Sequence, residues 1–324
     1  MPEDEIPKIK GMEEDTGANR PVAPVPEEPS KHHKKLAFVL TALFVVLAVA
    51  AGIQAYNRYR TNKPVEKPAV KVGVLMAFTG GSSNMGYGTM KGIQLAKKQL
   101  GADNVELVQA DSQCNPKVAK TAMQSLIDQG VVAVIGDGCS SASLAALMVA
   151  NSNKIPMVSP SASSTTLSIA NDYFFRVIPS DNYQAAYIAQ AIRKQGITRV
   201  AVFYTNEPYG SAMNKSFQEQ FKTLGGSVVA TAYAEPDDIN LATEMQKLGA
   251  ANPQAVFIAP NSLVTGTAAI QIARDQGIVA PLFGGDILYD KTLLTNAPVA
   301  SGGLTLTTFA TGDASFKRML LNEY

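Results

Sequence analysis

From residue 69 onward the chain alternates short apolar, β-branched runs with longer amphipathic stretches. The runs Val70–Phe78 and Val131–Gly136 are apolar at most positions, which is typical of strands buried on both faces. The stretch Gly88–Leu100 instead places its apolar residues at helical spacing. Because strands of this kind alternate with helices, the pattern predicts an α/β fold with parallel sheets and helices on both faces.

The alternation restarts after the segment FFRVIPSD, Phe174–Asp181. The predicted strands are 70–78, 104–110, 131–136, 155–160, 199–205, 227–234, 255–260 and 281–285. The predicted helices are 88–100, 116–130, 141–152, 185–196, 211–226, 242–252 and 267–277. Two successive series with a break at Pro179 predict two doubly wound parallel-sheet lobes, the first over 69–178 and the second over 179–309. Ligands in such folds bind at the C-terminal ends of strands, so we expect a cleft between the lobes.

The first 68 residues follow a different pattern. Residues 1–35 are rich in proline and charge and poor in large apolar side chains, which predicts a disordered tail. The 20 residues Leu36–Ala55 carry no charge, and at about 1.5 Å per residue they match a hydrocarbon core of about 30 Å. We expect a single-pass membrane anchor with a cytoplasmic N-terminus, followed by a stalk over 56–68 and an extracytoplasmic body. A cleaved secretory signal, which would release the protein, is the alternative.

The composition argues against nucleic acid as a partner and against histidine-dependent catalysis or metal binding. The formal net charge is +1, so there is no basic surface that would indicate nucleic acid as a partner. The chain's 2 histidines, His32 and His33, are adjacent and lie upstream of the anchor. A Ser-His-Asp triad, a Cys-His pair or a histidine-ligated metal therefore cannot form in the body. We expect no metal, no cofactor and no enzymatic activity.

The 2 cysteines, Cys114 and Cys139, each follow a predicted strand. Parallel strands end side by side, and an oxidising compartment favours one disulfide between two such cysteines. A reactive thiolate is the functional alternative, but the body has no histidine to activate it.

Cys139 lies in the stretch IGDGCSSAS, where Ser140 and Ser141 open a predicted helix. A serine there most simply caps the helix. The same free amides and a hydroxyl also suit an anionic group such as a carboxylate. A second hydroxyl-rich loop, Ser159–Leu167, follows a neighbouring strand, and the other lobe offers Tyr209 and Asp286. Hydroxyls facing an aromatic ring and a carboxylate suit a zwitterion such as an amino acid.

These stretches together resemble the branched-chain (Leu/Ile/Val) amino-acid-binding family of ABC-transporter substrate-binding proteins, which has the type I periplasmic binding fold. The resemblance covers about Val70 to Tyr324 and rests on the order and spacing of VGVLMAFTG…MGYGTMKGIQLA, ADSQCNPKVA…SLID, VIGDGCSSAS, IPMVSPSASSTTL, FFRVIPSD, VAVFYTNEPYG and LFGGD. It implies a permease and an ATPase as partners and a Cys114–Cys139 disulfide.

The resemblance also implies roles for five residues. Ser140 would bind the ligand carboxylate through its hydroxyl and backbone. Ser161 would offer a backbone contact and Ser163 a hydroxyl contact to the ammonium group. Tyr209 would close over the ligand from the second lobe, and Asp286 would be the counter-charge of the ammonium.

The chain departs from the family pattern at three places. Met85 and Asn261 stand where the family usually has aromatic residues, which predicts a smaller and more polar pocket. Family members also continue beyond the position of Tyr324. We therefore expect that residues 310–324 return to an incomplete first lobe. We also expect that the chain is a fragment in which the C-terminal part of the fold is missing.

Two other functions compete with this interpretation. A membrane-anchored sensory ectodomain would have the same lobes, and the metabotropic glutamate receptors resemble this fold. The tail before the anchor contains no signalling domain, however. A hydrolase using Ser140 or Cys139 is the second alternative, and the absence of histidine from the body argues against it.

Overall fold

The computed structural model describes residues 31–61 and 68–308 of the protein. The chain divides into two compact units, Met1–Glu66 and Lys67–Tyr324. Several sequence predictions lie outside the described residues. These are the tail over 1–30, the part of the stalk at 62–67, and the return of 310–324 to the first lobe.

The described part of the first unit is one long helix, α1 (Lys31–Thr61). Its segment Lys35–Arg60 is long and apolar enough to cross a membrane, with a mean hydropathy of 2.8, and a signal sequence would pass the same test. The predicted anchor Leu36–Ala55 lies inside this helix. The helix also includes residues 31–35 and 56–61, which we expected in the tail and the stalk. No proline or glycine follows Gly52 before Thr61, so the helix propagates through the polar flanks.

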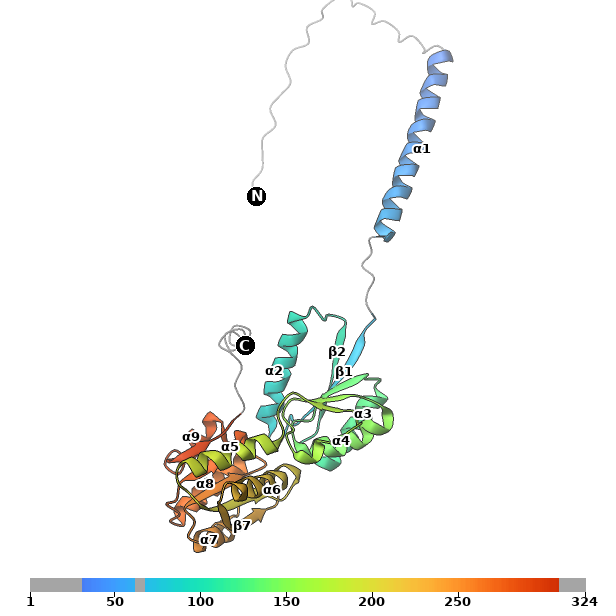
Figure 1. The fold of residues 1–324 in the computed structure, drawn as a ribbon. Helices are drawn as coiled ribbons and strands as arrows, with labels where there is room; N and C mark the ends of the chain where they lie inside the picture. Colours follow the sequence, from blue (N-terminus) through green and yellow to red (C-terminus); the bar gives the residue numbers. More distant parts are fainter. Residues whose placement is uncertain (1–30, 62–67, 309–324) are drawn as a thin grey trace, which may run out of the picture. The chain divides into compact units, whose positions relative to one another are not determined.

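The second unit contains two five-stranded sheets, and every strand pair in both is parallel. We name the first lobe as the elements β1 to β5 and the second lobe as the elements α5 to β10 (Figure 1). The first lobe comprises β1 (Val70–Met76), α2 (Ser83–Gln99), β2 (Val105–Asp111), α3 (Pro116–Asp128), β3 (Ala133–Gly136), α4 (Ser140–Asn153), β4 (Met157–Ser159), the 3-10 helix η1 (Thr165–Leu167) and β5 (Phe174–Arg176).

The second lobe repeats this plan. It comprises α5 (Asp181–Lys194), β6 (Arg199–Thr205), α6 (Pro208–Thr223), β7 (Ser227–Ala234), α7 (Ala242–Ala250), β8 (Ala255–Ala259), α8 (Leu263–Asp275), β9 (Leu282–Gly284), the 3-10 helix η2 (Asp286–Leu288), α9 (Lys291–Asn296) and β10 (Leu304–Leu306). The predicted α/β fold with two parallel sheets is confirmed. Within residues 68–308 the chain passes from the first lobe to the second between β5 and α5.

Both sheets have the same strand order. It is β2-β1-β3-β4-β5 in the first lobe and β7-β6-β8-β9-β10 in the second. Chain direction across the sheet therefore reverses between β1 and β3 and again between β6 and β8. Loops after strands at such a switch point diverge and leave a crevice, which is where open α/β sheets bind ligands.

Alternate residues of the central strands bury on opposite faces of each sheet. In β1, Leu75 packs in the same apolar cluster as Met123 and Leu126 of α3, whereas Val74 and Met76 pack in the cluster that contains Met90 of α2. In the second lobe, Val202 of β6 packs on the face covered by α5 and α6. Phe203 packs on the opposite face with residues of α7 and α8. Each sheet is thus held between helices, and its strand ends stay free to form a site.

Two three-residue edge strands, β5 and β10, and the short helix α9 were not predicted. The first turns of four helices were also missed, since α2 begins at Ser83, α5 at Asp181, α6 at Pro208 and α8 at Leu263. The SNMGY stretch is rich in weak helix formers, and Pro208 stands in the first helical turn, which accepts proline, so neither of these two first turns shows an apolar helical period.

Candidate functional site

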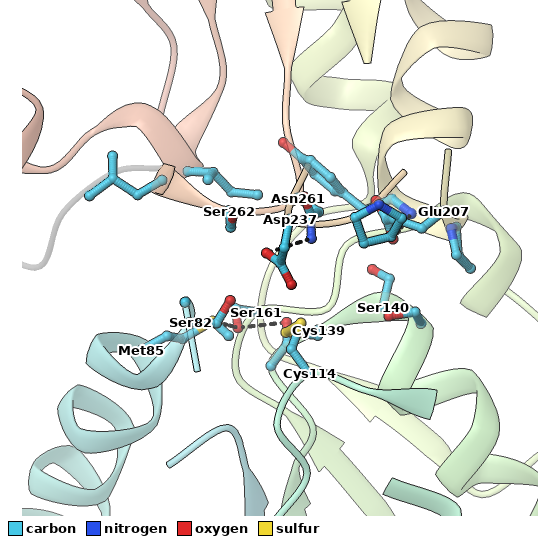
Figure 2. A pocket seen from close by; sticks show the side chains of 18 of the residues that line it. Ser82, Met85, Cys114, Cys139, Ser140, Ser161, Glu207, Asp237, Asn261 and Ser262 are labelled. Atoms are coloured by element: carbon cyan, nitrogen blue, oxygen red, sulfur yellow. Dashed lines mark hydrogen bonds between the residues drawn. A yellow bond between two sulfur atoms is a disulfide. The ribbon is translucent and has the colours of Figure 1, made fainter. Parts of the chain in front are cut away.

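The main cavity lies between the lobes and has a volume of about 780 Å³ (Figure 2). Loops that follow β1, β2, β3 and β4 line it from the first lobe, and loops that follow β6, β7, β8 and β9 line it from the second. Ser140, Ser161, Ser163, Tyr209 and Asp286 all line this cleft, as do Cys114 and Cys139. The structure therefore brings the residues singled out in the sequence into one place.

Asp137 holds the loop between β3 and α4 in place through hydrogen bonds of its carbonyl and its carboxylate. Its carbonyl oxygen accepts hydrogen bonds from the hydroxyls of Ser143 (3.0 Å) and Ser159 (2.6 Å). Its carboxylate accepts the Cys139 amide at 2.7 Å. Burial raises the pKa of Asp137 to about 6, and that amide bond opposes the shift. These contacts set where α4 begins.

Helix α4 starts at Ser140, and the N-cap position is Cys139, whose side chain makes no capping hydrogen bond. The expectation that Ser141 caps this helix is wrong, because Ser141 is already helical. The Ser140 side chain also does not cap the helix; its Oγ accepts the amide of Ser164 at 3.2 Å. The amides of the first helical turn have no partners within the helix, so this end of α4 presents donors to the cleft.

Cys114 and Cys139 form a disulfide, with their Cα atoms 5.5 Å apart. The bond joins the loop after β2 to the loop after β3 at the wall of the cleft (Figure 2). The expected disulfide is therefore present, and Cys139 has no free thiolate that could act as a nucleophile in this structure.

Ser161 and Ser163 lie in the loop after β4. The Ser161 hydroxyl donates to the carbonyl of Gly138 at 3.1 Å, which ties the β4 loop to the β3 loop. The carbonyl of Ser163 accepts hydrogen bonds from the Arg176 guanidinium (2.9 Å) and from the Asp181 amide (3.0 Å). This loop is thus held by the segment that leads into the second lobe.

Tyr209 is positioned by the start of α6. Glu207 is the N-cap of this helix and accepts the amides of Tyr209 (2.9 Å) and Gly210 (2.6 Å). The Tyr209 hydroxyl donates to the Asp286 carboxylate at 3.4 Å. Burial, and then the negative charge of Asp286, raise the pKa of Tyr209 well above its ordinary value. The phenol therefore stays a hydrogen-bond donor at neutral pH.

Asp181, Glu207 and Asp286 form a buried acidic group around Tyr209. Burial is the main cause that raises the pKa of each carboxyl, to about 7 for Asp181. Asp181 is 0% exposed, and neither of its carboxylate oxygens has a hydrogen-bond partner among the described residues. The charge of Arg176 and the nearby Ser163 hydroxyl oppose the shift at Asp181. A cation bound beside this group would favour the ionised form of each carboxyl.

Asn261 and Met85, where the resemblance led us to expect aromatic residues, both line the cleft. The Asn261 side-chain amide donates to Asp237 at 3.5 Å, and Ser161 contacts Met85 Sδ at 3.2 Å. Within the described residues, no group of three or more His, Cys, Asp or Glu side chains is arranged to hold a metal ion.

Sequence reasoning missed Asp137, Asp181, Glu207 and Asp237. Asp137 and Glu207 each stand four residues before a predicted helix, in the polar loops 137–143 and 206–211 that follow strands, so each was visible as a loop residue. Asp237 lies in EPDD immediately after the predicted strand 227–234, at a strand end of the kind that binds ligands. Asp181 carried no such signal, because its burial depends on how the loop after β4 meets α5.

Fold and cleft together define a two-lobed ligand-binding protein with polar strand-end loops facing each other. A comparison with protein families matches the model described as "Periplasmic binding protein" over residues 69–319. The chain therefore belongs to the periplasmic binding protein family.

Individual relatives agree with this assignment. The chain is 27% identical to the leucine-specific-binding protein of Salmonella typhimurium over 207 residues, which cover 60% of this chain and 52% of that protein. It is 24% identical to the Leu/Ile/Val-binding protein of Escherichia coli over 250 residues, covering 74% of this chain and 67% of that protein. The chain spans about half the length of the first curated relatives that it matches.

Solved structures show the same fold. A leucine-binding protein from Thermotoga maritima superposes with a TM-score of 0.74 at 28% identity, covering 79% of this chain and 76% of that one. A branched-chain amino-acid transporter substrate-binding protein from Streptococcus pneumoniae, solved with isoleucine, superposes with a TM-score of 0.70 at 24% identity, covering 79% and 77%.

Proposed function

We propose that the protein is an extracytoplasmic solute-binding protein of an ABC transporter that binds an amino acid or a similar small zwitterion between its lobes. The observation that carries this proposal is that the N-terminus of α4, with Ser140, shares one cleft with the Asp286 carboxylate. Helix-terminal amides and a hydroxyl suit a carboxylate, and a buried carboxylate suits an ammonium group. The amino-acid-binding relatives support the same ligand class.

Each of the other predicted site residues has a place in this scheme. Ser161 offers backbone groups and Ser163 a hydroxyl to the ammonium end of the ligand. Tyr209, held by Asp286, closes over the ligand from the second lobe. Asp181 lies behind this end of the cleft and adds negative potential without needing to touch the ligand.

Binding proceeds by closure of the two lobes, with residues 69–178 and 179–309 as the moving bodies. The ligand stabilises the closed state because only that state lets both walls contact it at once. No covalent step is part of this function, so the protein is not an enzyme. The closed, loaded protein then delivers its ligand to a permease that an ATPase drives.

The helix α1 supports an extracytoplasmic location for this activity. Its apolar segment, Leu36–Ala55, acts as a single-pass anchor with a cytoplasmic N-terminus. Alkaline extraction of membranes and N-terminal sequencing of the mature protein test the anchor. An intact N-terminus in the membrane pellet is expected, and a chain that begins after Ala55 in the soluble fraction would contradict it.

Titration calorimetry of the full chain in detergent against the twenty amino acids tests the function. At least one amino acid is expected to bind, and a panel without any binder would overturn the proposal. Asp286→Ala is expected to weaken binding of the amino acid far more than binding of its des-amino carboxylic acid. Asp275→Ala, which removes an exposed carboxylate on α8, is the matched control. Equal losses for both ligands in Asp286→Ala would argue against the ammonium role.

A further inference from the structure

The walls of the cleft carry charge of only one sign. Five carboxylates line it, those of Glu207, Glu235, Asp237, Asp286 and Asp290. Among the described residues that line it there is no lysine, arginine or histidine. All five carboxylates belong to the second lobe, whereas the first lobe contributes hydroxyls, amides and the disulfide.

Three of these carboxylates already have structural partners. Glu207 caps α6 through two backbone amides. Asp290 caps α9 through the Thr292 amide at 2.7 Å, and these hydrogen bonds lower the pKa of its carboxyl. Glu235 accepts the side-chain amide of Asn206 at 2.9 Å. These three need nothing from a ligand.

Asp286 and Asp237 differ from them. The Tyr209 hydroxyl donates to Asp286 at 3.4 Å, and the Gln184 side chain and the Ile287 amide also favour its charged form. The proposed function already assigns Asp286 to the ligand's α-ammonium group. Among the described residues, Asp237 accepts one long hydrogen bond, from the Asn261 side-chain amide at 3.5 Å. Figure 2 shows the Asp237 carboxylate pointing down from the second lobe into the cleft, toward Ser161 and the disulfide.

A second acceptor beside Asp237 also lacks a donor. The Oδ1 atom of Asn261 is buried and has no hydrogen-bond partner among the described residues. Asn261 lines the cleft and its amide nitrogen faces Asp237. A buried acceptor without a donor is costly, and a carboxylate beside it attracts a cationic donor in particular. An ammonium group has three donors and no acceptor, and a guanidinium group has five.

Asp237 also reaches across to the first lobe. A Cβ atom on Gly81 would lie 3.6 Å from Asp237 Oδ1 and 3.9 Å from Ser262 Cβ. In this arrangement of the lobes, the carboxylate meets a wall that offers it no positive charge. Closure over a neutral ligand would strip water from Asp237 without replacing it, and a ligand cation removes that cost.

We propose that the ligand carries a second cationic group, bound by Asp237 and Asn261 Oδ1, so that the cleft selects an amino acid whose side chain ends in an ammonium or guanidinium group. This inference rests on the proposed function, because it uses Ser140 for the carboxylate and Asp286 for the α-ammonium. It adds the chemistry of the side chain and places its recognition on the loops after β7 and β8.

The test is titration calorimetry of the full chain in detergent with lysine, arginine, norleucine, leucine and cadaverine. Norleucine has the carbon chain of lysine without the terminal amine, and cadaverine lacks the carboxylate. Lysine or arginine is expected to bind at least about 10-fold more tightly than norleucine, the size of a good charge-assisted hydrogen bond. If norleucine or leucine binds as tightly as lysine and arginine do, the proposed second cationic group of the ligand is wrong, while the proposed function stays intact. Failure of every amino acid would overturn the proposed function itself.

Two variants locate the effect. Asp237→Asn is expected to remove the preference for lysine over norleucine. Asp238→Asn removes the same charge from the next residue, which does not line the cleft and bonds the Asn240 amide, so the preference should persist. Equal changes in the two variants would overturn the assignment to Asp237. Cadaverine binding as tightly as lysine would overturn the amino-acid class, because the carboxylate would then contribute nothing.

Discussion

The hydroxyl of Ser164 in the first lobe donates a 2.8 Å hydrogen bond to the carbonyl of Pro208 in the second. The amide of Ser164 donates in turn to Ser140 Oγ at 3.2 Å. Ser164 therefore connects the residue proposed to hold the ligand carboxylate with the first residue of α6, which carries Tyr209. One residue, Ser164, therefore links the contact between the lobes to the proposed carboxylate site.

The Ser164–Pro208 bond should strengthen ligand binding, because it joins the two lobes in the arrangement that forms the cleft. Ser164→Ala is expected to weaken amino-acid binding about fivefold, the equivalent of one hydrogen bond of about 1 kcal/mol. Titration calorimetry measures this. Thr166→Val is the control, since Thr166 shares a hydrogen bond with Ser164 Oγ but, among the described residues, has no hydrogen bond to the second lobe. An unchanged affinity in Ser164→Ala, or an equal loss in Thr166→Val, would count against the role of the bond.

Two glycines of α2 should respond oppositely to alanine. A Cβ on Gly86 would lie 2.0 Å from the carbonyl oxygen of Ala77, whereas a Cβ on Gly88 would have nothing within 4 Å. Gly86→Ala should lower the free energy of unfolding by about 1–3 kcal/mol, because backbone must shift. Gly88→Ala should raise it by up to about 1 kcal/mol through helix propensity. Urea unfolding followed by circular dichroism decides this, and effects of the same sign would refute the close approach of α2 to the end of β1.

Reduction of the Cys114–Cys139 bond should destabilise the lobes. The cysteines are separated by 25 positions, and closing a loop of that length is worth about 3.5 kcal/mol in the chain-entropy model. Urea unfolding with and without dithiothreitol measures the loss, and the double variant Cys114→Ala/Cys139→Ala should reproduce it without reductant. A protein whose unfolding curve ignores dithiothreitol, or that labels with two thiols before reduction, would contradict this expectation.

Stability should fall as the pH rises through the range in which Asp181 ionises only in the unfolded chain. The pKa of Asp181 is about 7 in the folded protein, against 3.8 for an ordinary aspartate. Between these values the folded state binds the extra proton, so the free energy of unfolding decreases with pH, and it becomes level above about pH 7.

Asp181→Asn should therefore stabilise the protein at pH 8 but not at pH 4. The gain has an upper limit of about 4 kcal/mol, because each pKa unit corresponds to about 1.4 kcal/mol. Melting temperatures at the two pH values measure it, with Asp103→Asn, an exposed carboxylate, as the control. A variant equally stabilised at pH 4 and pH 8 would show that the ionisation of Asp181 is not the cause.

The repeated order of strands and helices was predictable because strands of a buried parallel sheet are continuous apolar runs in the sequence. The strands 199–205 and 227–234 match β6 and β7 residue for residue, since polar residues bound both runs. The edge strands β5 and β10 were not predicted because a strand of three residues is too short to show an alternation of apolar and polar positions. All five predicted ligand residues reached one cleft, because topology alone places strand ends together.

The sequence pattern did not show which acidic side chains become buried or which groups they face. Asp181 follows Ser180 at the start of a helix, as many exposed aspartates do, and its burial arises only where η1, α5 and α6 meet. Asp237 lies in a run of polar residues after β7 and has a positive φ of 64°. Its place opposite Gly81 depends on the second lobe meeting the first, which no local pattern encodes.

The uneven distribution of charge between the two lobes has a consequence for how binding specificity evolves in this protein. In the proposed binding mode, the first lobe holds the ligand carboxylate through backbone amides and hydroxyls that few substitutions can alter, and Asp286 of the second lobe holds the α-ammonium group. The variable part of the ligand would meet the loops after β7 and β8, whose side chains are each replaceable alone. A new preference can therefore arise by exchanging two or three residues near Asp237 and Asn261 while the invariant end of the ligand stays anchored.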